Sequence, residues 1–148
     1  VEKVSLSVGP EEYKVKTLAE AMPQSSISAS LKLTEFNYSD TWPPAAYVGF
    51  YQGAVKDKSI QFLIIRNRRC EQYVDAGYRI INEDQEIFVE TLENLPIDSM
   101  VRVKLQFDNG IVSLKLNENA AISIKTSITE ASPYVSVSSG SAEFDVGP

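Results

Sequence analysis

The stretch VRVKLQFDNGIVSLKLNEN, residues 101–119, carries the clearest structural signal in the chain. Apolar and polar residues alternate from Val101 to Phe107, which is the period of a strand with one buried face. The sequence Asp-Asn-Gly follows at 108–110, and Asn and Gly tolerate the positive φ angles of tight hairpin turns. Alternation resumes over 112–116. The stretch therefore predicts an amphipathic β-hairpin, which needs more sheet to cover its apolar face.

The same alternation recurs along the rest of the chain. Residues 11–22 fit a strand followed by an irregular turn, and the Pro-Pro pair within 37–45 indicates a loop. The segment 70–81 is interpreted as one strand broken at Ala76-Gly77 by a bulge or a bend. We expect eleven or twelve strands in all. The other predicted strands span 2–8, 26–36, 46–52, 59–68, 86–92, 121–126, 134–138 and 141–146.

These patterns predict a fold class and a domain organisation. No helix of three turns has a convincing apolar stripe, and neither an internal repeat nor a linker divides the chain. A chain of 148 residues, 43% of them hydrophobic, can bury a sizeable core as one unit. The prediction is a single all-β domain over 1–148, either a sandwich or a barrel.

Charge and composition exclude several classes of function. The net charge of −6 would oppose binding to nucleic acid. No apolar run is long enough for membrane insertion as a helix. The sequence has no histidine and one cysteine, Cys70, so the commonest general base is absent and no intrachain disulfide can form. We expect an extracellular or cell-surface location, although no signal peptide is visible.

Five segments resemble the concanavalin A-like lectin/glucanase superfamily, which includes laminin G-like sandwiches. The resemblance extends from Ser26 to Val146, and its most telling parts are the hairpin with its DNG turn and the closing GSAEFDV. It implies a jelly-roll β-sandwich of two antiparallel sheets. The segments are SISASLKL (26–33), AYVGFYQ (46–52), FLIIRN (62–67), VRVKLQFDNGIVSLKLN (101–117) and SGSAEFDV (139–146).

Catalysis is disfavoured by the acidic residues. Glucanases of that superfamily carry clustered acidic residues on one strand, and no Glu-x-Asp-x-Glu occurs here. Glycoside hydrolysis usually needs two carboxyl groups close together. Glu86 and Glu90 would share a strand face, which more simply indicates a solvated face. A Ser, Thr or Cys nucleophile would lack a histidine base. We expect no enzyme, with glycoside hydrolase or lyase left open as a third class.

Sugar recognition remains as the leading function. Protein sites for sugars combine an aromatic platform with amide, carboxylate or guanidinium groups. Tyr47 and Tyr51 would project from the outer side of a sheet if Val48 and Phe50 are core, but cross-strand aromatic pairing explains them equally well. Trp42 is either a stacking platform or a lid over the core. The candidate ligand-binding residues are Trp42, Tyr47, Tyr51, Gln61, Arg66, Arg68, Tyr73 and Tyr78.

Other reactive residues have simpler interpretations. The basic run 66–69 fits local ion pairs, for instance with Glu71, or a sulfated or uronic-acid glycan. Cys70 is expected to be a small core residue. Asp40, Asp108 and Asp145 are expected at turns and strand ends, so no metal site is predicted. No cofactor is predicted either, and calcium stays open because the resemblance implies sandwiches that bind it.

The sequence therefore predicts a non-catalytic carbohydrate-binding, lectin-like or adhesion module. Its expected partner is an oligosaccharide or polysaccharide, with attached domains or a protein partner also compatible. The competing class is a structural or protein-interaction sandwich that binds no sugar. That class would be favoured if Tyr47 and Tyr51 were buried under neighbouring strands, or if an edge strand formed a dimer.

Overall fold

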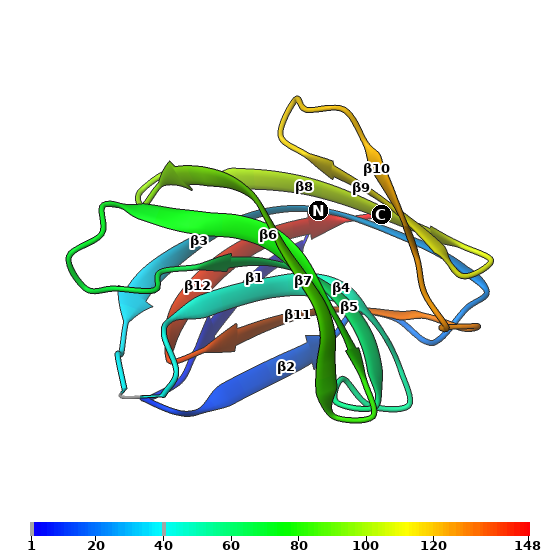
Figure 1. Ribbon diagram of the computed structural model, residues 1–148, viewed down its shortest axis with the longest axis horizontal. Coiled ribbons are helices and arrows are strands. Elements are labelled where there is room, and N and C mark those ends of the chain that lie inside the picture. The colour runs from blue at the N-terminus through cyan, green and yellow to red at the C-terminus, as the bar shows by residue number, and fades with distance from the viewer. Residues whose placement is uncertain (1, 40) are drawn as a thin grey trace.

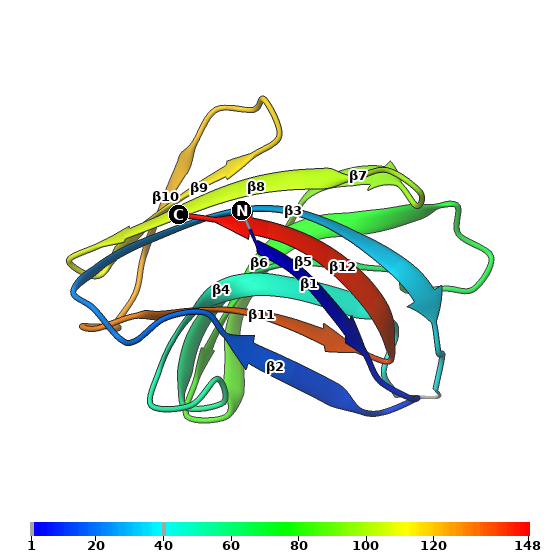
Figure 2. The ribbon, with the colours of Figure 1, turned by 180° about the vertical axis from the view of Figure 1, so that it is seen from behind.

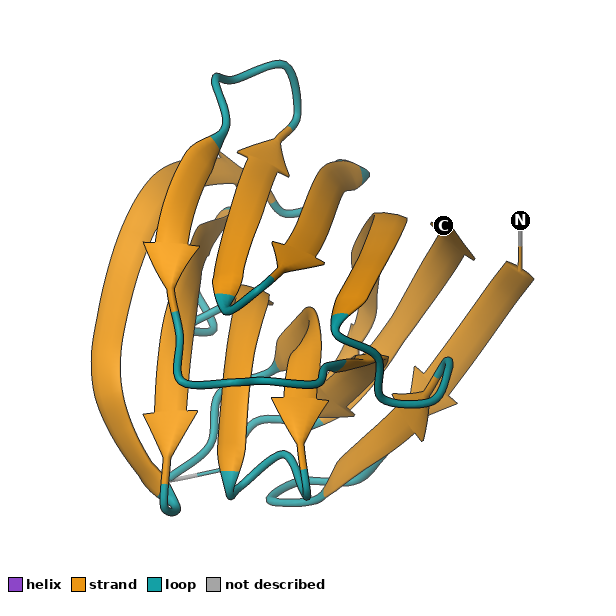
Figure 3. Cartoon of the chain, turned by 90° about the vertical axis from the view of Figure 1, so that its right-hand side faces the viewer, coloured by secondary structure: helices purple, strands orange, loops and turns teal. Residues whose placement is uncertain are grey.

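The computed structural model describes residues 2–39 and 41–148, and every regular element in them is a β-strand (Figures 1 and 3). It contains no helix in these ranges, and therefore none that could cross a membrane. The strands are β1 (Glu2–Ser7), β2 (Tyr13–Thr17), β3 (Gln24–Phe36), β4 (Ala45–Gln52), β5 (Lys58–Ile65), β6 (Tyr73–Asn82), β7 (Gln85–Pro96), β8 (Val101–Asp108), β9 (Ile111–Leu116), β10 (Ile122–Lys125), β11 (Ser132–Ser138) and β12 (Gly140–Gly147).

The strands form two six-stranded antiparallel sheets. The first sheet has the order β1-β12-β3-β8-β9-β10, and the second has the order β2-β11-β4-β5-β6-β7. Neighbours in space are often distant in sequence, because β1 and β12 pair at the two ends of the chain (Figure 2). This arrangement is a jelly-roll β-sandwich, which confirms the predicted fold class.

The hairpin predicted at residues 101–119 is present as β8 and β9. Asp108 pairs with Ile111, so Asn109 and Gly110 form a two-residue turn. Both have positive φ angles, 50° at Asn109 and 82° at Gly110, as a tight hairpin turn requires. Buried and exposed residues alternate strictly along β8, so the period read from the sequence gives the correct face.

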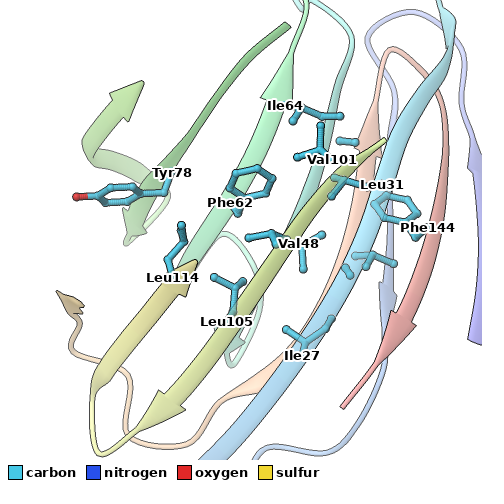
Figure 4. Packing of buried hydrophobic residues seen from close by; sticks show 14 of the residues in the cluster. Ile27, Leu31, Val48, Phe62, Ile64, Tyr78, Val101, Leu105, Leu114 and Phe144 are labelled. Carbon is cyan, nitrogen blue, oxygen red and sulfur yellow. The ribbon is translucent and has the colours of Figure 1, made fainter. Parts of the chain in front are cut away.

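The apolar faces of both sheets meet in one shared core. Val48 and Phe50 of β4 are fully buried, and the rings of Phe50 and Phe107 lie 5.8 Å apart across the two sheets. Figure 4 shows side chains from both sheets interleaved, with Phe62 between Val48 and Tyr78. The interior is therefore held by contacts between strands far apart in the chain.

Several predicted strands differ in extent from the observed ones, and the largest differences are at β5, β6 and β7. β5 ends at Ile65, earlier than expected, and the chain then leaves the sheet until Tyr73. Cys70 lies in this loop and is exposed, so its prediction as a core residue is wrong. The apolar alternation stops before the cysteine, which therefore has no sheet face to occupy. β7 continues to Pro96, beyond the predicted end at residue 92.

Bulges decide which way the side chains of β6 and β7 face. The β6–β7 register shifts at Ala76-Gly77, the predicted position, but the extra residue is Leu92 of β7, so the prediction that the 70–81 strand itself is broken there is wrong. A second shift at Ile80/Ile81 inserts one residue into β7. Because of it, Glu86 lies on the outer face and Glu90 on the core side, beside Tyr78. The expectation that these two carboxylates share a face is wrong, since one extra residue inverts the alternation.

Candidate functional site

A groove of about 500 Å³ opens on the outer face of the second sheet. Its floor is formed by side chains on the face of the sheet opposite the core. Among them are Tyr47 on β4, Gln61 on β5 and Arg79 on β6. One wall is formed by Trp42 in the loop before β4, and the other by Asp84 in the β6–β7 turn and Glu86 at the start of β7. We call this hollow the outer groove.

Strand register brings the polar residues of the floor together. Gln61 lies directly between Gly49 on β4 and Arg79 on β6. Gly49 has no side chain, and an added Cβ would overlap the carbonyl oxygen of Ile60. The Arg79 side chain reaches across β5 as far as the Tyr47 ring on β4. Sequence positions 47, 61 and 79 thus meet on one surface.

Arg79 is fixed by three partners. Its Nε donates a hydrogen bond of 2.5 Å to Oε1 of Gln61, and its Nη1 lies 3.5 Å from Oε2 of Glu86. The guanidinium carbon lies 5.0 Å from the centre of the Tyr47 ring, which is a cation–π distance. The hydroxyl groups of Tyr47 and Ser138 share a 3.1 Å hydrogen bond. Arg79 is therefore held in one orientation, with guanidinium N–H groups left over for a ligand.

Aromatic side chains form the rim beside β2. Trp42 is 40% exposed, and its ring lies 6.4 Å from that of Tyr13, centre to centre. The Trp42 backbone N–H donates to the Ser39 hydroxyl at 2.9 Å, which ties down the start of the loop. The groove consequently has a rigid polar floor and an accessible aromatic rim.

Two hydroxyl groups are buried next to the floor. Tyr134 is fully buried, with the Tyr51 ring packed edge-on at 5.4 Å. Within residues 2–39 and 41–148, neither the Tyr134 hydroxyl nor the Ser59 hydroxyl has a partner at hydrogen-bond distance. Burial raises the pKa of Tyr134, so its phenol stays neutral well into the alkaline range.

The structure brings together three of the eight predicted ligand-binding residues. Trp42, Tyr47 and Gln61 line the outer groove. Tyr51 projects from the same face of β4, as predicted, but its hydroxyl pairs with that of Thr17 at 2.7 Å. Tyr47 is only 8% exposed, so the ring is a buried part of the groove floor, whereas Tyr51 is half-buried.

The other four predicted residues do not line the outer groove. Arg66 donates hydrogen bonds to the backbone carbonyls of Glu71 and Arg69, so it stabilises the loop that follows β5. Arg68 is exposed in that loop, and Tyr73 is exposed at the start of β6.

Tyr78 points towards the core. Its ring stacks on Phe88 at 5.5 Å, and Figure 4 shows it beside Phe62. Burial, followed by the neighbouring Glu90 carboxylate, raises the pKa of Tyr78. The role of Tyr78 follows from the face of β6 on which it lies, and that face belongs to the core.

Arg79, Glu86 and Ser138 are groove residues that the sequence prediction missed. Arg79 sits between Tyr78 and Ile80, so alternation could have placed it on the outer face. Glu86 carried no such signal, because the bulge in β7 is not visible in the sequence. Arg79, Glu86 and Ser138 supply charged and hydroxyl groups to the groove.

No cluster of three or more potential metal ligands is found in the described part of the chain. Asp108 accepts a hydrogen bond from Gln24, and Asp145 pairs with Lys3 at 3.4 Å. Asp40 lies outside the described residues. Asp108 and Asp145 are therefore engaged at strand ends with partners on neighbouring strands.

Comparison with known proteins assigns the fold. No protein-family model and no curated protein sequence matches the chain. Among solved structures, the carbohydrate-binding module CBM66 from Bacillus subtilis is similar, with a TM-score of 0.62 and 11% identity over 90% of this chain and 78% of that one. The chain therefore has the jelly-roll β-sandwich fold, in agreement with the resemblance to the concanavalin A-like superfamily.

Two further solved structures have a similar fold. A toad ovary galectin in complex with thio-digalactose matches with a TM-score of 0.55 and 10% identity, over 98% of both chains. The PL7 alginate lyase AlyA1 from Zobellia galactanivorans matches with a TM-score of 0.53 and 12% identity, over 90% of this chain and 64% of that one. At such identities the likeness establishes the fold alone.

Proposed function

We propose that this chain is a non-catalytic carbohydrate-binding module that holds an oligosaccharide or a segment of polysaccharide in the outer groove. The observation that carries the proposal is the fixed guanidinium of Arg79, set among Gln61, Glu86 and Tyr47. It lies in a hollow of about 500 Å³ that also contains the exposed ring of Trp42. Pockets for small ligands usually have volumes of roughly 300–1,000 Å³.

The groove matches the two surfaces of a sugar ring. The apolar C–H face of a sugar can stack on Trp42, because an aromatic ring gives a flat apolar surface. Sugar hydroxyls can accept from the guanidinium N–H groups of Arg79 and donate to the carboxylate of Glu86. Because Arg79 is already oriented, little side-chain entropy is lost on binding.

Structural neighbours support a glycan as the partner class. One is named as a carbohydrate-binding module and another holds thio-digalactose. Binding needs only the donors, acceptors and platform described above, and no chemical step. We place the protein outside the cell or at its surface, where polysaccharides and glycan chains are available.

A protein-interaction sandwich without sugar binding is the alternative. It is favoured by the burial of Tyr47 and by the contact of Tyr51 with Tyr134, which give both tyrosines a packing role. The two functions give Trp42 different roles. Its ring is more exposed than those of Tyr47 and Tyr51, and only sugar binding uses it as a contact surface.

The test is a glycan-array screen followed by titration of each hit. Trp42 is the only tryptophan, so its fluorescence reports directly from the groove rim. Trp42→Ala and Arg79→Lys should each weaken binding about tenfold or more, measured by calorimetry. Matched controls outside the groove are Tyr73→Ala and Arg68→Lys, which should bind as the wild type does.

Three outcomes would contradict the proposal. Silence on neutral, acidic and sulfated glycans, with and without calcium, would favour the protein-interaction alternative. Binding that is lost in Tyr73→Ala but retained in Trp42→Ala would exclude the outer groove as the site. Shortening of a bound polysaccharide by the purified chain would show catalysis.

A further inference from the structure

The second sheet ends in two edge strands of opposite character, β2 and β7. Within residues 2–39 and 41–148, no strand pairs with the outer edge of either one. β7 carries three consecutive exposed apolar residues, Ile87, Phe88 and Val89, which are 58%, 45% and 56% exposed. An exposed apolar edge strand offers unpaired backbone groups to another strand. β7 is therefore a surface that a further strand could cover.

The charges of the two edges are complementary. Residues 83–93, the turn and the first part of β7, contain five acidic residues and no basic one. β2 has the sequence YKVKT, with Lys14 and Lys16, and its acidic neighbours Glu11, Glu12 and Glu20 lie outside the strand. Two copies of β7 would bring carboxylates together, whereas β7 beside β2 brings carboxylates to ammonium groups. The charge pattern selects β2 as the partner of β7.

Strand direction permits this pairing. The sheet has six strands and every neighbouring pair is antiparallel, so β2 and β7 run in opposite directions. A second copy, moved along the sheet and rotated by the sheet twist, would place its β2 antiparallel to β7. The outer grooves of the two copies would then lie on the same side of the extended sheet.

The alternation of faces also agrees. Lys14 pairs with the core residue Val137, and Glu90 pairs with Tyr78, so both side chains are on the core side of the sheet. With Val15 opposite Val89, Lys14 lies opposite Glu90 and Lys16 lies opposite Phe88. Lys16 already pairs with Glu2 at 2.7 Å, whereas Lys14 has no ion partner in the described part of the chain. This register gives Lys14 a carboxylate and Val89 an apolar neighbour.

We propose that β7 of one molecule pairs with β2 of a second copy of this chain, extending the second sheet from one molecule to the next. The two surfaces in contact are different, so the association is heterologous. Any such assembly keeps a free β2 at one end and a free β7 at the other. It can therefore grow without closing into a dimer. This association does not depend on glycan binding.

Sedimentation velocity over a range of protein concentrations tests the assembly. The average mass should rise continuously with concentration rather than stop at the mass of a dimer. Added salt should reduce it, since the contact relies on partly exposed charges. A chain that stays monomeric at every concentration, even at low salt, would overturn the proposal.

Charge exchange between two variants tests the pairing itself. Lys14→Glu and Glu90→Lys should each weaken association about tenfold or more, because each places like charges opposite one another. An equimolar mixture of the two should associate again, since every contact in an alternating array then joins opposite charges. Lys104→Glu makes the same charge change as Lys14→Glu, but on the outer face of the first sheet. It should associate as the wild type does. Far-UV circular dichroism confirms that each variant is folded.

Two further outcomes would overturn the proposal. A closed dimer that is lost in Glu90→Lys but unchanged in Lys14→Glu would show that β7 pairs with itself. A mixture that associates no better than the separate variants would show that Lys14 and Glu90 do not meet.

Discussion

Tyr134 illustrates how a single residue supports the groove from below. Its ring is fully buried on the outer face of β11, against Tyr51, and lies across from Gly49. Its hydroxyl has no partner at hydrogen-bond distance among the residues that the structure describes. A buried hydroxyl without a partner opposes folding, because it gave up its hydrogen bonds to water. The residue therefore contributes packing, while its polar atom contributes little.

Replacing Tyr134 by phenylalanine tests this interpretation. At neutral pH we expect Tyr134→Phe to leave the free energy of unfolding unchanged or slightly increased, within about 1 kcal/mol. The measurement is urea denaturation followed by circular dichroism. A loss of several kcal/mol would contradict the prediction, since it would mean that the hydroxyl makes a strong hydrogen bond.

The same variant should change the response to alkaline pH. Burial raises the pKa of Tyr134 above the ordinary value of 10.0, so above pH 10 the unfolded chain loses this proton while the folded chain keeps it. The unfolded state then binds fewer protons, and stability falls as pH rises. Tyr134 should contribute about 1 kcal/mol to this fall between pH 10 and 11, and about 1.4 kcal/mol per pH unit above that. Tyr134→Phe should show a correspondingly shallower loss between pH 10 and 11 in urea denaturation.

The β8–β9 hairpin shows how one element sets the geometry of its sheet. Its two-residue turn fixes the register of the two strands, so that Leu105 pairs with Leu114 and both face the core. The turn depends on Gly110, whose φ of 82° is unfavourable for any residue with a Cβ. The register of the pair thus rests on a single backbone conformation.

Substituting Gly110 tests that dependence. Gly110→Ala should reduce the free energy of unfolding by about 1–2 kcal/mol, the cost of a left-handed conformation for an L-residue. The matched control is Gly147→Ala in β12, where an added Cβ meets no atom within 4 Å. Urea denaturation of both variants gives the comparison. Equal stabilities for the two would show that the turn adopts another conformation at no cost.

At the scale of the whole molecule, one apolar interior joins the two sheets. Phe50 from the second sheet and Phe107 from the first are both essentially buried, with their rings 5.8 Å apart. Neither sheet can cover its apolar face alone, so each depends on the other. We therefore expect the two sheets, and the groove carried by the second, to unfold together.

Removing one of these rings tests the coupling. Phe107→Ala should reduce the free energy of unfolding by about 3–5 kcal/mol, because it leaves a cavity between the sheets. Far-UV circular dichroism and Trp42 fluorescence should still report one transition, although Trp42 lies over the other sheet. Phe88→Ala, at a half-exposed site on β7, should cost much less. Two separated transitions would contradict the shared core.

The sequence by itself determined the strands and the faces of most of them. Alternation of apolar and polar residues follows from the geometry of a single strand, so Val48 and Phe50 could be assigned to the core before any pairing was known. The Asn-Gly turn is equally local, because it depends on the φ angles of two residues. Twelve strands, within the range expected, follow from such local signals.

Only the tertiary structure decided which of these strands become neighbours. Arg79, Gln61 and Tyr47 lie on three strands, and their contacts depend on register between strands. A single bulge moved Glu86 to the groove side, and the early end of β5 left Cys70 in a loop. Strand pairing and bulges arise from interactions between distant segments, which the period of one segment does not contain. For that physical reason the sequence determined the sandwich, and the assembled sheets determined the groove.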